Sequence, residues 1–172
     1  KYEISLKKRK RIYLEDSRYY VEDVRKNVVD KYGFDKVYKQ GFNIKTPLDL
    51  KLQEISSDVL RNGIENYDRR NGWRGSIKNI NLSNKNWQSS FKNNLEKKIG
   101  WELARIIKVD GNEIKIETEN DKIGEINISS LGWIKSNDKK NSFKSGDIIY
   151  VKKIKNSVYE LKQLPDVNGA IV

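Results

Sequence analysis

Two Ser-x-x-Lys pairs have the residue types and spacing of a catalytic group: Ser5 with Lys8, and Ser136 with Lys139. On a helix this spacing places the lysine one turn from the serine, where it can help to make the hydroxyl a nucleophile for acyl transfer. The second pair is followed by Lys144-Ser145-Gly146, which is close to a further motif of the same chemistry.

The surroundings of these pairs argue against catalysis. Lys and Arg together account for 35 of the 172 residues, so matches of this kind are expected by chance. Ser136 stands in the polar stretch SNDKKN, which offers nothing apolar to bury a helix start or to desolvate a lysine. Lys144 to Gly146 is better explained as a turn before a strand. We therefore predict no catalytic residue in this chain.

The chain contains no His, Cys or Met. The absence of His and Cys removes the commonest metal ligands, the usual acid and base at neutral pH, and the Cys-His class of nucleophiles. We accordingly predict neither a metal nor a cofactor. Without cysteine no disulfide can form, which suits a cytosolic or an extracytoplasmic setting. No run approaches the ~20 apolar residues of a membrane span. Because the chain opens on Lys1, we expect a piece of a longer protein.

The formal net charge of +11 favours a nucleic-acid hypothesis, because Lys and Arg neutralise phosphates. The lysines are however spread along the chain among abundant Asn and Ile. The basic run Lys7 to Arg11 (KKRKR) lies near the start, where a solvated linker is the usual interpretation. Specific binding of nucleic acid is therefore the less favoured hypothesis.

The stretch Tyr67 to Gly75 (YDRRNGWRG) separates a half with helical periodicity from a half with short strands. Its arginines could form an anion pocket. We favour a structural junction, in which Asn71-Gly72 turns the chain, Trp73 fills the joint and the arginines bond the free carbonyls at the end of the helix. The predicted junction residues are Arg69, Arg70, Gly72, Trp73 and Arg74.

The first half predicts two amphipathic helices. Apolar residues recur every four positions from Tyr20 to Tyr32, after Ser17 as N-cap, and this helix should end at Gly33. An extended piece, Gly41 to Thr46, follows. The pattern that follows predicts Thr46 as the N-cap, Pro47 as the first helical residue and Asp49 as a capping-box carboxylate. The second helix should run to about Tyr67 and cover one side of a sheet.

The second half predicts a small barrel. Residues 77–98 are polar, and this pattern predicts a covering loop with one turn of helix. Alternating residues and turn signals, including Asp110-Gly111, then indicate five strands, with the insert SSLGW between the third and the fourth. This layout is typical of an OB-type barrel. The predicted fold class is therefore α+β: a helical linker region followed by a small five-stranded OB-like β-barrel.

OB barrels often bind single-stranded nucleic acid by stacking bases on exposed aromatic rings. Trp101, Trp133 and Tyr150 are the candidates here. Both tryptophans follow a glycine and adjoin apolar positions, which favours packing in the core or lid of a barrel over stacking.

Four stretches together resemble the region between the two enzymatic domains of class A, 1A-type penicillin-binding proteins. They are YYVEDVR (19–25), GFNIKTPLDLKLQ (41–53), YDRRNGWRG (67–75) and QLPDVNGAIV (163–172), and they occur in the family's order. Thr46-Pro47 and Ser17-Arg18 depart from the family's more usual residues without changing the predicted elements.

The resemblance implies a parent anchored in the bacterial inner membrane by a single pass, with a peptidoglycan glycosyltransferase and a serine-type transpeptidase on the periplasmic side. The catalytic residues of both would lie outside this chain. The implied domains are a flexible linker (1–16), a helical region beside the transpeptidase (17–76), an OB-like module (77–163) and a lead-in strand of the transpeptidase (164–172).

The implied partners are the catalytic domains of the same protein and, in some family members, an activating outer-membrane lipoprotein. The alternative from another class is a freestanding basic OB protein that binds RNA or single-stranded DNA.

Overall fold

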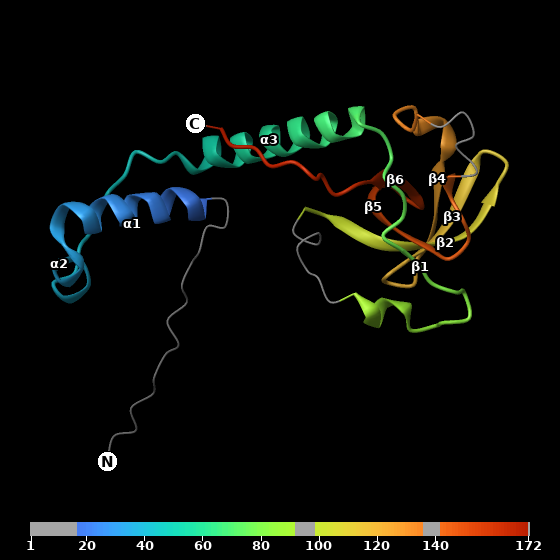
Figure 1. Ribbon diagram of the computed structural model, residues 1–172, viewed down its shortest axis with the longest axis horizontal. Coiled ribbons are helices and arrows are strands. Elements are labelled where there is room, and N and C mark those ends of the chain that lie inside the picture. The colour runs from blue at the N-terminus through green and yellow to red at the C-terminus, as the bar shows by residue number, and fades with distance from the viewer. Residues whose placement is uncertain (1–16, 92–98, 136–141, 172) are drawn as a thin grey trace, which may run out of the picture. The chain divides into compact units, whose positions relative to one another are not determined.

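The computed structural model describes residues 17–91, 99–135 and 142–171. The described residues form two compact units, one made of residues 17–61 with Ile171, and one that lies within Asn62–Ala170. Figure 1 labels their helices and strands. The division falls inside helix α3 (Leu50–Arg70), whereas the sequence places a domain limit after residue 76. The last turns of α3 therefore belong with the barrel.

The first unit begins with α1 (Arg18–Tyr32), whose predicted limits are confirmed. Ser17 is the N-cap residue, although its hydroxyl makes no capping hydrogen bond, and Gly33 ends the helix by donating its N–H to Val29 O at 2.8 Å. The short helix α2 (Phe34–Lys39) was not predicted. The stretch Gly41 to Thr46 lies in no strand.

Helix α3 begins later than predicted, so the assignment of Thr46 and Pro47 to its first turn was wrong. Asp49 is the cap: its Oδ1 accepts from the N–H groups of Lys51 at 2.9 Å and Leu52 at 3.1 Å. This carboxylate satisfies two of the amides that a helix start leaves free.

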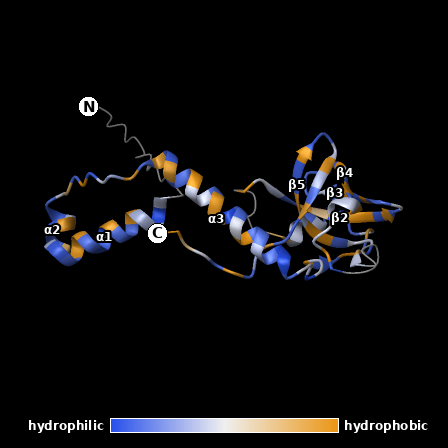
Figure 2. Cartoon of the chain, turned by 90° about the horizontal axis from the view of Figure 1, so that it is seen from above, coloured by the Kyte–Doolittle hydropathy of each residue, from blue (hydrophilic) through white to orange (hydrophobic). Residues whose placement is uncertain are grey.

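The apolar face of the first part of α3 is exposed, and its role of covering a sheet stays a prediction. Leu52, Ile55 and Val59 are 61%, 49% and 59% exposed. Hydrophobic residues appear as orange bands along α1 and α3 in Figure 2.

The second unit is a closed barrel, which confirms the predicted OB-like fold. Its strands are β2 (Trp101–Asp110), β3 (Glu113–Thr118), β4 (Ile123–Asn127), β5 (Asp147–Lys155) and β6 (Val158–Lys162). They are joined in the order β5-β2-β3-β4-β6, and β6 pairs again with β5. All pairs are antiparallel except β4 with β6. The 3-10 turn η3 (Ile128–Ser130) lies between β4 and β5 and overlaps the start of the predicted insert SSLGW (129–133). The two-residue strand β1 (Lys78–Asn79), which pairs with β5, was not predicted.

The barrel encloses a core of branched apolar side chains on the inward positions of its strands. Ile106, Ile114, Ile116, Ile126 and Leu161 are fully buried there. A second cluster lies under the predicted covering loop, where the short helix η2 (Trp87–Ser90) places Trp87 against Leu103 and Ile148. The loop is held by Arg105, whose guanidinium donates to Asn84 O at 2.8 Å. The predicted covering role of this loop is confirmed for the part that the structure describes.

Candidate functional site

The last turn of α3, the following residues to Gly75, β6 and residues 163–166 meet in a polar junction. The chain turns sharply at its start: Asn71 N–H donates to Asp68 O at 2.9 Å, and Gly72 N–H donates to Arg69 O at 3.0 Å. Gly72 has φ +92°, a left-handed conformation that glycine adopts readily after a helix. This turn directs residues 73–75 along the barrel.

Asp68 is the acceptor at the centre of the junction. Its side chain is only 3% exposed. It accepts from Arg74 Nη1 at 2.6 Å, Gln163 Nε2 at 2.8 Å and Asp166 N–H at 3.3 Å. Burial acts to raise the pKa of Asp68, but the hydrogen bonds from Arg74 and Gln163 outweigh it and hold this pKa below its usual value. The carboxylate is therefore a stable buried anion.

Gln163 and Arg74 extend the same network. The Gln163 side chain accepts from Arg74 N–H at 2.9 Å and donates to Gly72 O at 3.1 Å. The Arg74 guanidinium donates to Leu164 O and forms an ion pair with Asp166 at 2.9 Å. The segment that leaves the helix and the segment that leaves β6 are thus bonded to each other as well as to Asp68.

A second, ionic part of the junction is centred on Lys162. Its Nζ lies 2.9 Å from Glu65 Oε2 and 3.3 Å from Glu160 Oε2, and the side chains of Lys162 and Glu65 are 9% and 10% exposed. Arg69 pairs with Glu160 at 2.7 Å and donates to Leu161 O at 3.3 Å. Burial acts to raise the pKa of Glu160, but Arg69 and Lys162 lower it below its usual value.

Both cations of this part also lie over aromatic rings. Lys162 Nζ is 5.6 Å from the ring centre of Trp101, and the Arg69 guanidinium carbon is 5.3 Å from that of Trp133. Such contacts add to the attraction from the carboxylates. The two cations therefore have few alternative positions, and the end of α3 is fixed on β6.

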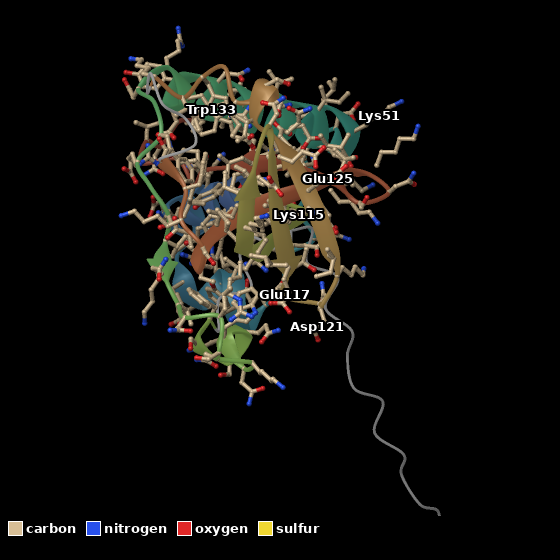
Figure 3. All side chains as sticks on the ribbon, turned by 90° about the vertical axis from the view of Figure 1, so that its right-hand side faces the viewer. Lys51, Lys115, Glu117, Asp121, Glu125 and Trp133 are labelled. Carbon is tan, nitrogen blue, oxygen red and sulfur yellow. The ribbon has the colours of Figure 1, made fainter. Side chains whose placement is uncertain are left out.

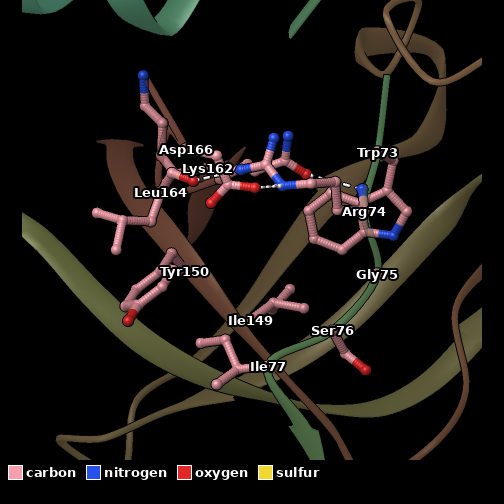
Figure 4. A pocket seen from close by; sticks show the side chains of 11 residues that line it. Trp73, Arg74, Gly75, Ser76, Ile77, Ile149, Tyr150, Lys162, Leu164 and Asp166 are labelled. Carbon is pink, nitrogen blue, oxygen red and sulfur yellow. Dashed lines mark hydrogen bonds and ion pairs between the residues drawn. The ribbon is translucent and has the colours of Figure 1, made fainter. Parts of the chain in front are cut away.

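A groove of about 220 Å³ adjoins the junction. Ile77, Ile149, Tyr150 and Leu164 line its apolar part, with Arg74 and Asp166 at the polar side (Figure 4). Arg74 is paired with Asp68 and Asp166, and Lys162 is paired with Glu65 and Glu160, so the charged groups beside the groove are committed to the junction. The groove therefore has no free charged group with which to bind an anion.

The model of the penicillin-binding protein OB-like domain family matches residues 73–167. The chain belongs to this family. It is also 36% identical, over 98% of its length, to penicillin-binding protein 1A of Rickettsia prowazekii, and 32% identical over 92 residues to penicillin-binding protein 1A of Neisseria flavescens. It spans about a fifth of the Rickettsia protein, 22% of its length.

A solved structure supports the same fold. The crystal structure of penicillin-binding protein 1A from Haemophilus influenzae superposes with a TM-score of 0.61 at 22% identity, over 86% of this chain and 22% of that one. Among the helices that the structure describes, none has the length and apolar content to cross a membrane.

The predicted junction residues of this OB-like domain protein are placed as follows. Arg69, Gly72 and Arg74 take part in the network, and Trp73 packs against Trp133 with ring centres 5.9 Å apart. Arg70 lies over the ring of Tyr67 at 5.2 Å. Arg69 bonds to Glu160 and Leu161 of β6, and Arg74 bonds to the side chain of Asp68 and to Leu164 and Asp166 after β6. These partners differ from the helix carbonyls that the sequence suggested.

Sequence reasoning missed the other members of the junction, namely Glu65, Asp68, Glu160, Lys162, Gln163 and Asp166. Gln163 and Asp166 lie in a stretch that carried the family resemblance. Asp68 lies in another. Their positions in these stretches were the available sign that the three residues matter. Nothing in the sequence indicated that they contact one another.

The three candidate stacking residues are used by the barrel itself. Trp101 is 3% exposed, and its ring lies 6.1 Å from that of Tyr150, which packs on the second core cluster. Trp133 packs against the main core. Core packing, the favoured prediction, is confirmed.

The outer face of β3 and β4 is where OB barrels commonly bind oligonucleotides. Its outward residues are Glu113, Lys115, Glu117, Ile123, Glu125 and Asn127. Lys115, Glu117 and Glu125 are visible there in Figure 3. Glu117 is ion-paired with Arg105 at 2.6 Å, and the carboxylates of Glu113 and Glu125 outnumber the ammonium of Lys115, so this face is unfavourable for phosphates.

The Ser-x-x-Lys pairs and the basic run Lys7 to Arg11 lie outside the described residues. Lys144 to Gly146 forms a turn into β5, as predicted: Lys144 N–H donates to Asp147 Oδ2 at 2.8 Å, and Gly146 has φ +88°.

Proposed function

We propose that this chain is a noncatalytic linker and docking module of a class A penicillin-binding protein, and that it sets the positions of the catalytic domains on either side of it. The intact protein would be a peptidoglycan synthase on the periplasmic side of the bacterial inner membrane. Its glycosyltransferase would polymerise lipid II, and its transpeptidase would crosslink the stem peptides. Membership of the OB-like domain family and the likeness to 1A proteins over a fifth of their length support this proposal.

The observation that carries it is the double attachment at Asp68. This carboxylate bonds to Arg74, just after the helix that leads into the barrel, and to Gln163 and Asp166, just after the last barrel strand. Gln163 and Asp166 are 95 and 98 residues from Asp68 in the chain. Since the segments leading in and out are bonded to the same group, neither can turn independently of the barrel.

A partner bound to the barrel would therefore act on both flanking segments at once. An outer-membrane lipoprotein is the partner that we propose for this role. The junction would pass its effect to the transpeptidase side through residues 163–166 and to the helix side through α3.

The test uses the intact synthase with Asp68→Ala and Gln163→Ala together, against the matched control Asp58→Ala on the exposed surface of α3. We expect the crosslinked fraction of the product to fall about fivefold, which corresponds to about 1 kcal/mol of lost positioning. Polymerisation of lipid II and acylation by a fluorescent penicillin should stay near the wild-type level. A junction variant that crosslinks normally, while near-UV circular dichroism shows an altered junction, would contradict the proposal.

The alternative of a freestanding protein that binds RNA or single-stranded DNA has less support. Its usual binding face carries Glu113, Glu117 and Glu125, and the aromatic rings that could stack bases are packed within the barrel.

A further inference from the structure

The tip of the β5–β6 hairpin combines exposed lysines with an exposed isoleucine. The sequence there is Lys152-Lys153-Ile154-Lys155-Asn156-Ser157, and every residue of it is exposed. Ile154 is 64% exposed. The two strands are joined by the short turn Asn156-Ser157, with Asn156 at φ +45°.

The backbone itself holds Ile154 outward. Strand pairing shifts register between Lys153, which faces Tyr159, and Lys155, which faces Val158, so Ile154 is the extra residue of a β-bulge. Bulges redirect side chains and are specific features of a strand. The exposure of this isoleucine therefore results from a defined backbone feature of the hairpin.

Strand β4 brings a second exposed isoleucine to the same end of the barrel. Glu125 pairs in parallel with Val158, and its N–H donates to Ser157 O at 2.8 Å. Ile123 precedes Glu125 by two residues, so it lies level with the hairpin turn. It is 60% exposed and follows the exposed Lys122.

We name this surface the hairpin-tip patch. Its members are Lys122, Ile123, Lys152, Lys153, Ile154 and Lys155. Two acids adjoin it: Asp121 accepts a hydrogen bond from Gln88 at 2.9 Å on the side of η2, and Glu125 lies beside Ser157. The four lysines outnumber these two carboxylates, so the patch keeps a net positive charge.

We propose that the hairpin-tip patch docks on the surface of a bilayer that contains anionic phospholipids. Lysines near such a surface are attracted to the phosphates, while apolar side chains on the same face enter the boundary between headgroups and acyl chains. The four lysines of the patch can contact the phosphates, and its two isoleucines can enter the region below the headgroups. A soluble anionic polymer would engage the lysines and leave the isoleucines in water, so the pair of isoleucines favours a lipid surface. This inference rests on the geometry of the hairpin and is independent of the proposed function.

The test needs a probe at one place, because a chain of net charge +11 is drawn to any anionic surface. The absence of cysteine makes a unique label simple. In the whole chain, Ser157→Cys places an environment-sensitive fluorophore at the hairpin turn. Ser130→Cys, exposed after the other end of β4, is the matched control position.

With vesicles of phosphatidylcholine and phosphatidylglycerol in equal amounts, we expect a blue shift and brighter emission from the label at position 157 and little change at position 130. Vesicles of phosphatidylcholine alone should give neither change. Equal shifts at the two positions, or no shift at position 157, would overturn the proposal. So would the same shift produced by polyphosphate, or by raising the protein concentration without lipid, which would indicate a second copy as the occupant.

Substitutions then separate the two components of the patch. K152Q/K153Q/K155Q should raise the lipid concentration for the half-maximal shift by about a hundredfold, at about fivefold for each lysine near the surface. The control K78Q/K85Q/K144Q makes the same change in charge at exposed lysines elsewhere and should have a much smaller effect. Ile154→Ser should reduce the blue shift while most vesicle binding remains. If the two triple variants lose binding equally, net charge alone explains the attraction and the patch is not the docking site.

Discussion

Gly124 on β4 lies against the ring of Tyr159 on β6 with no room for a side chain. A Cβ built at position 124 would come within 2.4 Å of Tyr159 Cε2 and 2.8 Å of Ser157 O. Tyr159 is 2% exposed and belongs to the barrel core, so its ring has no free space into which to move. The absence of a side chain at Gly124 is what allows β6 to close the barrel beside β4.

Gly124→Ala should therefore destabilise the protein. We expect the free energy of unfolding to fall by about 2–3 kcal/mol, as for other overpacked cores. Urea unfolding followed by tryptophan fluorescence measures this change. Gly132→Ala is the control, because a Cβ there meets no atom within 4 Å, and its effect should stay within about 0.5 kcal/mol. Equal unfolding midpoints for the two variants would show that the ring of Tyr159 moves aside.

Lys162→Met should also lower the free energy of unfolding, for an electrostatic reason. It removes the cation that lies 2.9 Å from the buried carboxylate of Glu65. Breaking one half of a buried ion pair typically costs about 3–5 kcal/mol, because the other charge stays buried without compensation. The double variant K162M/E65L should recover most of this loss in the same urea assay. A double variant as unstable as the single one would mean that Glu65 is not the main partner of Lys162.

The sequence predicted the barrel well because its signals are local. Alternation between inward and outward residues, together with turns such as Asp110-Gly111, marks strands within a few positions. The observed hairpin pairs Asp110 with Glu113 across that turn. The stop of α1 at Gly33 is a local signal of the same kind.

The features that were missed depend on distant partners or on competition between nearby residues. Strand β1 exists only through its pairing with Ile148 and Asp147, far along the chain. The junction joins Asp68 to Gln163 across 95 residues, and no local pattern records that pairing. At the start of α3, the sequence predicted Thr46 as the cap and Asp49 as a capping-box carboxylate inside the helix, whereas Asp49 is itself the cap because its carboxylate reaches two amides.

Stability should decrease in acid, below the ordinary pKa values of the carboxyl groups, because of the junction. The pKa of Asp68 and the pKa of Glu160 are lowered in the folded state from ordinary values of 3.8 and 4.5. The stabilisation is therefore complete above these ordinary values and is lost as the pH falls through the lower, folded-state pKa values. Urea midpoints between pH 7 and pH 2 measure this loss. Asp68→Asn should make the urea midpoint depend less on pH in acid. The control Asp58→Asn on α3 should keep the wild-type dependence on pH.

The isolated chain should not be labelled by a fluorescent penicillin. Acylation requires an activated serine, and the polar surroundings of Ser136 in the sequence offer no means of activating it. Gel fluorescence after incubation with the reagent measures this, with a serine-type transpeptidase as the positive control. A covalent adduct mapped to Ser136 by mass spectrometry would reverse the interpretation of the Ser-x-x-Lys pair.

Binding to single-stranded oligonucleotides should be weak and should vanish at moderate salt. The charge of +11 attracts phosphates without specificity, and attraction of this kind falls steeply with ionic strength as counterions are released. Fluorescence anisotropy of a labelled oligothymidine over a range of salt concentrations measures the slope. Glu113→Gln and Glu125→Gln remove repelling charges from the outer face of β3 and β4, so they should strengthen the weak binding slightly. A tight complex that persists at high salt would instead favour a nucleic-acid-binding OB protein, because it would require contacts other than charge.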